Sequence, residues 1–210
     1  MKKKILYIAA RNPYSNKYSG DRDRAKNTIK YLIKSYKVDL VCLGKNISFN
    51  NKKNKNLKIR IFKISLLNRL NNLLKSIFSN TPIHCGFYYS QNLLNFVRKN
   101  FNNYDYIFCN SIKTAQYLPE NFKGKKILDM IDLDSYRYKQ IYKSLSILNP
   151  LSYIYLFEYY KLLNYEKKIH YKFNKISFVS MKDLKLASNF INKKKLFFFP
   201  MGIKYSQLHY

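Results

Sequence analysis

The sequence predicts an α/β fold in which one mostly parallel sheet is covered by helices on both faces. Two observations lead to this prediction. Short runs that are apolar at nearly every position alternate with segments of helical periodicity, and strands buried on both faces of a sheet have this continuous apolar character. The chain has 210 residues, which is enough for one domain with a sizeable core.

The apolar runs are the candidate strands of this sheet. They are Lys4–Ala10, Val38–Leu43, Leu57–Ile64, Tyr104–Asn110, Lys126–Ile131, Lys175–Val179 and Lys195–Phe199. Between the first two runs, Ala25, Ile29 and Leu32 are spaced as on one face of a helix, within Asp21–Tyr36. The chain therefore opens with a strand, a helix and a second strand, the βαβ unit of parallel sheets.

The segment Leu66–Phe78 is predicted to be a strongly amphipathic helix. Leucines, Ile77 and Phe78 line one face, whereas asparagines, Arg69 and Lys75 fill the other. Two interpretations fit this pattern. The helix packs on the domain's own sheet, which is the commoner arrangement, or it lies in a membrane interface with its cations near anionic headgroups.

Two further helices are predicted toward the end of the chain. A long one lies within Leu145–Phe173, after an interruption at Pro150. Ser180 followed by Asp183 has the spacing of a capping box, which predicts another helix beginning there. The Lys- and Asn-rich stretch Lys45–Asn56 lacks apolar periodicity and is predicted to be an exposed connection.

The composition indicates a folded protein with a basic surface. Hydrophobic residues make up 47% and aromatic residues 17% of the chain, too much for a disordered polyelectrolyte, although the net charge is +29. Such a charge attracts nucleic acid or anionic membranes. However, Lys, Asn, Ile and Tyr are abundant together, as a coding bias toward A and T would produce. A generally basic, solvated surface therefore explains the charge equally well.

Several function classes lack support in the sequence. There is no run of the roughly 20 apolar residues that span a bilayer, and no recognised nucleic-acid-binding motif. The cysteines and histidines have neither metal-ligand spacing nor a Ser/His/Asp arrangement, so we expect no metal site and no catalytic triad; they are Cys42, Cys85, Cys109, His84, His170 and His209. The cysteines are predicted to be buried, reduced thiols of a cytoplasmic protein.

The loop after the first strand is the first candidate binding segment. It ends in Ser19, Gly20, Asp21 and Arg24, where the first helix begins. A glycine lets backbone amides approach a ligand closely, and a helix N-terminus with neighbouring arginines suits a phosphate or sugar hydroxyls. The alternative is that Asp21 only caps the helix and the arginines are solvated.

Polar residues also follow two later strands. Asp129 and Asp132 lie at the end of one strand, with Tyr136 just beyond, and Asn110 and Ser111 end another. Ligands of open α/β sheets bind outside the carboxyl ends of the strands, so Asp132 is well placed to orient or deprotonate a hydroxyl. The alternative is that these residues only cap the helices that follow.

Several stretches, taken in order, resemble one known family. They are Pro13–Ala25, Asn110–Leu118, Leu128–Ser135, Asn164–Glu166, Phe178–Asp183 and Phe199–Ile203. Together they resemble family 4 glycosyltransferases, and most closely the bacterial sugar transferases found with exosortase-type exopolysaccharide systems. Met201 and Lys204 replace the usual Asn and Asp of the stretch that leads into that family's second domain.

The resemblance implies a retaining GT-B enzyme with two Rossmann-like domains and no bound metal. The first domain binds the acceptor, and the second binds a nucleotide-sugar through residues that include a Glu-x7-Glu-like pair. Residues 1–200 correspond to the acceptor domain, and residues 201–210 correspond to the start of the crossing. We therefore expect this domain to bind no cofactor and to be inactive without a donor-binding half, whether continuous with it or a separate chain.

On this assignment, Asp132 is the candidate catalytic residue. The candidates for binding the acceptor or a phosphate are Ser19, Gly20, Asp21, Arg24, Asn110, Ser111, Asp129 and Tyr136. The expected acceptor is a lipid-linked saccharide of envelope or exopolysaccharide synthesis, at the inner face of the cytoplasmic membrane, with no nucleic-acid partner. The alternatives are a basic non-enzymatic module for nucleic acid or anionic membranes, and an inactive remnant.

Overall fold

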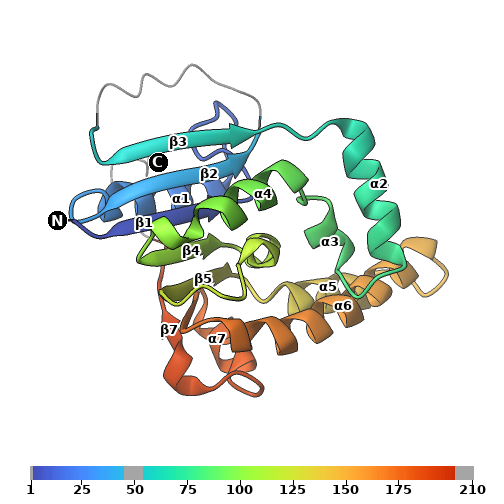
Figure 1. The fold of residues 1–210 in the computed structure, drawn as a ribbon. Coiled ribbons are helices and arrows are strands. Elements are labelled where there is room, and N and C mark those ends of the chain that lie inside the picture. The colour runs from blue at the N-terminus through green and yellow to red at the C-terminus, as the bar shows by residue number, and fades with distance from the viewer. Residues whose placement is uncertain (1, 45–53, 202–210) are drawn as a thin grey trace, which may run out of the picture.

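Seven parallel strands form one sheet within residues 2–44 and 54–201, which are the residues that the computed structural model describes (Figure 1). The strands are β1 (Lys4–Ala9), β2 (Lys37–Leu43), β3 (Leu57–Phe62), β4 (Tyr106–Asn110), β5 (Lys125–Ile131), β6 (Lys175–Phe178) and β7 (Leu196–Phe198). Their order across the sheet is β3-β2-β1-β4-β5-β6-β7. Parallel pairing throughout confirms the predicted α/β class, and every strand overlaps its predicted run.

Helices connect the strands. They are α1 (Gly20–Leu32), α2 (Leu66–Ile77), α3 (Ile83–Gly86), α4 (Gln91–Asn100), α5 (Asp134–Ser144), α6 (Pro150–Ile169) and α7 (Met181–Ala187), with 3₁₀ helices at Phe101–Asn103, Ile112–Tyr117, His170–Lys172 and Lys193–Lys195. The predictions of α1, α2, α6 and α7 are confirmed. Ser180 caps α7 by accepting the backbone N–H of Lys182 and Asp183. The predicted interdomain crossing after Met201 and most of the predicted connection at 45–56 lie outside the described residues.

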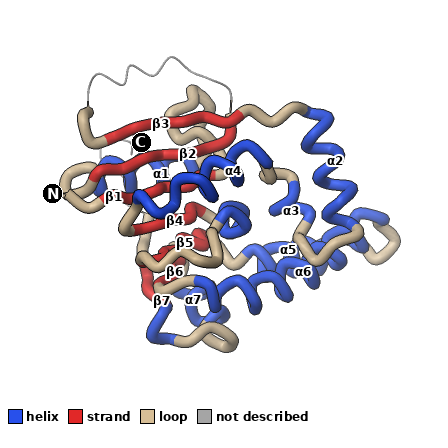
Figure 2. The backbone as a smooth tube through the Cα atoms, viewed as in Figure 1, coloured by secondary structure: helices blue, strands red, loops and turns tan. Residues whose placement is uncertain are grey.

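The core has two parts, one on each face of the sheet. Helices accordingly lie on both faces of the strands (Figure 2). Alternate residues of β1 point to opposite faces, so that Leu6 and Ile8 join one part and Ile5 and Tyr7 join the other. The first part packs against α3, α4 and the ends of α6 and α7, whereas α1 covers the second. All three cysteines are buried and free, as predicted.

Helix α2 stands away from the sheet, at the side toward which the strands point (Figure 1). Its leucines are largely solvent-exposed, including Leu67 at 78% and Leu74 at 58%, and Ser76 is its buried residue. The helix packs on α3 instead, and Asn72 Nδ2 donates to the carbonyl of Tyr89 at 2.9 Å. The favoured expectation that this helix packs on the domain's own sheet is therefore wrong.

Candidate functional site

Charged side chains from the segments that follow three strands lie near one another at the carboxyl edge of the sheet. Arg11 follows β1, Lys113 follows β4 and Asp132 follows β5, and these three strands are neighbours in the sheet. The charge of Lys113 acts on both Asp132 and Asp21, and Arg11 Nη1 lies 3.7 Å from Asp21 Oδ1. The sheet topology therefore gathers cations and carboxylates around one space, where ligands of open α/β sheets bind.

Backbone strain marks the same edge. Ser111 has φ 73° and Ile131 has φ 67°, and they are the non-glycine residues with positive φ among those described. Positive φ is energetically more unfavourable for a β-branched residue such as Ile131 than for most other residues. Ser111 follows β4 and Ile131 ends β5, where the pairing with β6 also shifts in register. Strained backbone clusters at functional sites, so both outliers favour a site here.

Asp132 comes directly after the strained Ile131. Its side chain is exposed, and no described residue forms a hydrogen bond with its carboxylate. Partial desolvation and the neighbouring charges of Asp134 and Asp183 raise the pKa of Asp132 above its ordinary value. The carboxylate is thus free to accept a hydrogen bond from a ligand, and it is more basic than an ordinary aspartate.

Arg24 and Asp129 lie in the interior and bind each other. The Arg24 Nε and Nη2 atoms donate to the Asp129 carboxylate at 2.7 and 2.8 Å, and Ser177 donates to the same carboxylate at 2.7 Å. Arg24 is 3% exposed and Asp129 is 0% exposed. This bidentate pair joins α1 to β5 behind the edge, so the two side chains support the site from within.

The other residues of the first loop lie at the N-terminus of α1. Ser19 is the N-cap residue, and its carbonyl accepts the N–H groups of Arg22 and Asp23. Burial opposes ionisation of Asp21, but the charges of Arg11 and Lys113 hold the pKa of that carboxyl below its ordinary value. Gly20 is exposed, and a Cβ there would meet only Met201, at 3.5 Å.

Asn110 and Ser111 lie beneath the edge. They are 4% and 7% exposed, and Asn110 Nδ2 and Ser111 Oγ have no hydrogen-bond partner among the described residues. Tyr136 lies on the side of α7, where Lys182 Nζ is 5.1 Å from its ring centroid. The edge therefore brings together Asp21, Asn110, Ser111 and Asp132, whereas Tyr136 lies to one side.

Several residues at the site have no clear signal in the sequence. Arg11 Nε and Nη2 donate to the hydroxyl of Tyr88 at 2.9 and 2.7 Å, and Tyr138 Oη lies 3.2 Å from His84 Nδ1. Burial, reinforced by nearby cations such as Lys113, lowers the pKa of His84 to about 4. The imidazole is therefore neutral near pH 7. His84 lies in α3, which is too short to produce a periodic pattern.

Two buried carboxylates of α6 hold the helices of the site. Glu158 accepts the N–H groups of Ile83 and His84 at 2.9 and 2.7 Å, and so caps α3. Glu166 accepts the N–H of Ser135 at 3.0 Å, near the start of α5. Burial raises the pKa of Glu166 to about 8. Helix α6 thus positions both His84 and the helix that follows Asp132.

Two negative findings concern the described part of the chain. Within residues 2–44 and 54–201, no group of three or more His, Cys, Asp or Glu side chains could hold a metal ion. No helix in these ranges is long and apolar enough to cross a membrane.

The fold and the edge define a Rossmann-like α/β domain with an open, polar site at the carboxyl ends of its strands. Its fold matches that of known GT-B glycosyltransferases. UGT89C1 of Arabidopsis thaliana, complexed with UDP-L-rhamnose, is 13% identical with a TM-score of 0.54, and the match covers 98% of this chain and 50% of that one. The E. coli trehalose-6-phosphate structure bound with UDP-2-fluoro glucose is 14% identical with a TM-score of 0.54, over 96% of this chain and 49% of that one.

The chain thus has the fold of about half of these proteins. At such low identity, the likeness concerns the fold alone. No protein-family model matches the chain, and no curated protein matches it by sequence.

Proposed function

We propose that this chain is the acceptor-binding half of a glycosyltransferase that moves a sugar from a nucleotide-sugar to an acceptor hydroxyl. The observation that carries the proposal is the free carboxylate of Asp132, exposed on strained backbone at the carboxyl edge. A carboxylate there orients or deprotonates the accepting hydroxyl. The GT-B fold and the resemblance to family 4, with its retaining transfer, support the same assignment.

The remaining roles follow from the position of each side chain. Asp21 and the backbone at Ser19 and Gly20 contact acceptor hydroxyls or a phosphate at the start of α1. The buried side chains of Asn110 and Ser111 form the floor beneath the acceptor, and Tyr136 closes the side near α7. Arg24 and Asp129 position these groups without touching the acceptor. The nucleotide-sugar binds a second Rossmann-like half, which either continues this polypeptide or is a separate chain.

The proposed acceptor is a lipid-linked saccharide of envelope or exopolysaccharide synthesis, reached from the inner face of the cytoplasmic membrane. The exposed leucines of α2 support peripheral contact with the bilayer, because they offer an apolar face beside the cations Arg69 and Lys75. An anionic leaflet attracts these cations and the chain's net charge of +29.

Turnover with the donor-binding half present tests the proposed function. The enzyme is incubated with a panel of UDP-sugars and a lipid extract, and sugar incorporation into lipid is followed. We expect Asp132→Asn to lower kcat by about 100-fold or more, which is typical for loss of a general base. Glu120→Gln is the control, because Glu120 is an exposed carboxylate on the loop that enters β5, at the opposite edge.

Two results would contradict the proposal in different ways. Full kcat and unchanged acceptor KM in Asp132→Asn would remove the assigned role of Asp132. Absence of transfer from every sugar nucleotide, with both halves folded and associated, would remove the glycosyltransferase function itself.

A further inference from the structure

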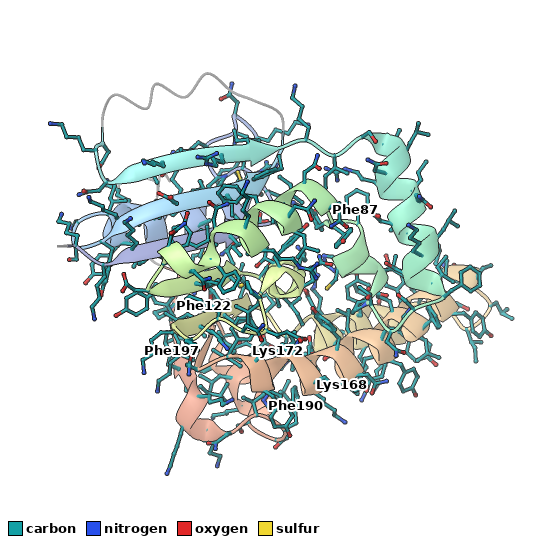
Figure 3. All side chains as sticks on the ribbon, viewed as in Figure 1. Phe87, Phe122, Lys168, Lys172, Phe190 and Phe197 are labelled. Atoms are coloured by element: carbon teal, nitrogen blue, oxygen red, sulfur yellow. The ribbon has the colours of Figure 1, made fainter. Side chains whose placement is uncertain are left out.

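An apolar groove lies beside the polar edge, between the pair α2–α3 and the pair α5–α6. It is a cavity of about 350 Å³ whose apolar lining includes Leu73, Ile83, Phe87, Leu151, Ile154 and Tyr155. Figure 3 labels Phe87, beside α3. We call this space the tail groove. It adjoins the acceptor edge, and Tyr88 and His84 belong to both.

The inner end of the tail groove meets the cations of the edge. Tyr88 lines the groove, and its hydroxyl accepts both hydrogen bonds from Arg11. Lys113 Nζ lies 5.1 Å from the Tyr88 ring centroid. Within the described residues, Lys113 forms no ion pair closer than 4.0 Å. The Tyr88 ring thus lies between the tail groove and Lys113, a cation with no close counter-ion.

The outer end of the tail groove opens to solvent through α6. Leu151 and Ile154 line the groove and are nevertheless 52% and 56% exposed. Beyond them, Ile147 and Leu148 of the turn between α5 and α6 are 70% and 89% exposed. Apolar side chains therefore line the groove from the surface to its cationic end. The one carboxylate in the lining, Glu158, is already engaged in capping α3.

We propose that the tail groove binds the first isoprene units of a prenyl phosphate lipid, whose phosphate lies against Arg11 and Lys113. The lining accepts a hydrocarbon, and the cations complement a phosphate joined directly to it. The volume is near the lower end of the roughly 300–1,000 Å³ of small-molecule sites, so it suits one short chain segment better than two acyl chains. That this lipid carries the accepting sugar rests on the proposed function.

Direct binding to this chain tests the tail groove without any donor half. Geranyl phosphate, farnesyl phosphate, farnesol and inorganic phosphate are titrated by calorimetry below their micellar concentrations. Each buried methylene raises affinity by about fourfold, so farnesyl phosphate should bind at least tenfold tighter than geranyl phosphate. It should also bind at least tenfold tighter than farnesol or inorganic phosphate. Affinity for farnesyl phosphate no greater than that for either single part would overturn the proposal.

Matched variants locate the binding. Ile154 and Tyr160 are both on α6 and both 56% exposed, but only Ile154 lines the tail groove. Ile154→Glu should weaken farnesyl phosphate binding by about tenfold or more, whereas Tyr160→Glu should leave it unchanged. Lys113→Ala should weaken farnesyl phosphate and leave farnesol unaffected. Equal effects of the two glutamate variants would overturn the location, and Leu151→Glu replaces Ile154→Glu if thermal unfolding shows that the latter does not fold.

The outcome is separable from that of the proposed function. Chain-length-dependent binding of prenyl phosphates, without sugar transfer by the completed enzyme, would leave the tail groove standing and remove the function. Conversely, the chain could fail to bind farnesyl phosphate while the completed enzyme transfers sugar equally fast to acceptors with and without a prenyl tail. That result would leave the proposed function standing and remove the tail groove.

Discussion

Asp129 and Asp132 lie close together in the sequence but have opposite surroundings. The Asp129 carboxylate is fully buried and accepts hydrogen bonds from Arg24 and Ser177. The Asp132 carboxylate is exposed and has no hydrogen-bond partner in the described part of the chain. A buried ion pair cannot lose one member cheaply, because the other charge is left without compensation. The two residues should therefore respond differently to the same substitution.

The first prediction compares Asp129→Ala with Asp132→Ala. Removing Asp129 leaves the Arg24 guanidinium buried and unpaired, so the free energy of unfolding should fall by about 3–5 kcal/mol. Removing Asp132 should change it by less than about 0.5 kcal/mol, as is usual for exposed positions. Urea unfolding measures both values. Similar losses in the two variants would show that Asp132 is structural.

The second prediction concerns pH and Glu166, whose pKa burial raises to about 8. The unfolded glutamate releases its proton near pH 4.3, so between these values the folded protein holds a proton that the unfolded chain has lost. The stabilising effect is complete below pH 4.3 and is lost as the pH rises toward 8, by up to about 1.4 kcal/mol per pH unit. Glu166→Gln should therefore gain stability relative to the wild type as the pH rises.

Urea unfolding at several pH values between 5 and 8 measures this gain. Glu120→Gln is the control, because Glu120 is 82% exposed. Wild-type and Glu166→Gln curves that run parallel across this range would mean that Glu166 is ionised in the folded protein.

Among the candidate site residues, the sequence predicts those at the ends of strands, including Asp132, Asn110 and Ser111. Their position is predictable because parallel strands end at one common edge. The sequence does not distinguish Asp129, which binds an arginine from a helix far away in the chain. It also gives no reason to join His84 and Tyr88 to Arg11, because those contacts depend on where the short helix α3 packs.

At the scale of elements, α2 and α3 pack unusually closely. A Cβ on Gly86 would overlap Ser76 Oγ and lie 3.2 Å from the carbonyl oxygen of Asn72. Lys161 adds a second link, because its ammonium group donates to the carbonyls of Ser76 and Ile77 at the end of α2. A helix that stands away from the sheet is thus held by α3 and α6.

The third prediction is that Gly86→Ala loosens α2. The added methyl group forces the two helices apart, and overpacking of this kind costs about 1–3 kcal/mol. Hydrogen exchange should show faster exchange of α2 amides, with little change in β1 or β4. Unchanged exchange in α2 would mean that the helix is held by Lys161 and not by its contact with Gly86.

The strands are the elements that the sequence predicts best, because burial on both faces makes them apolar at almost every position. The pattern of Leu66–Phe78 correctly predicts a helix and its apolar face. It cannot tell what covers that face, since core and membrane both select leucine. Helix α3 has only four residues, fewer than a periodic pattern needs.

At the scale of the whole molecule, α2 and the turn between α5 and α6 both lie at the end toward which the strands point (Figure 1). Both carry exposed apolar residues, which include Leu67, Leu148 and, just after α2, Phe78. An amphipathic surface of this kind binds a bilayer through buried apolar area and through attraction to anionic lipids. A bilayer bound to this surface would lie beside the polar edge.

The fourth prediction is binding to anionic liposomes that weakens as salt is raised. Leu67→Glu should reduce co-sedimentation by about tenfold, because it removes a leucine that the bilayer would bury and adds a charge that the anionic surface repels. Tyr31→Glu is the control, since Tyr31 is 74% exposed, close to the 78% of Leu67, but belongs to α1. Equal binding to neutral and anionic vesicles, or equal loss in the two variants, would contradict a membrane role for α2.

Arg24 gives the domain a mechanical property. Its guanidinium donates to the carbonyl of Pro200 at 3.4 Å and lies 4.5 Å from the ring centroid of Phe199. Two of its nitrogens also donate to the carboxylate of Asp129 on β5. The chain beyond β7 is therefore clamped to the strand that ends beside Asp132. A force applied at Pro200 is therefore transmitted through Arg24 and Asp129 to β5.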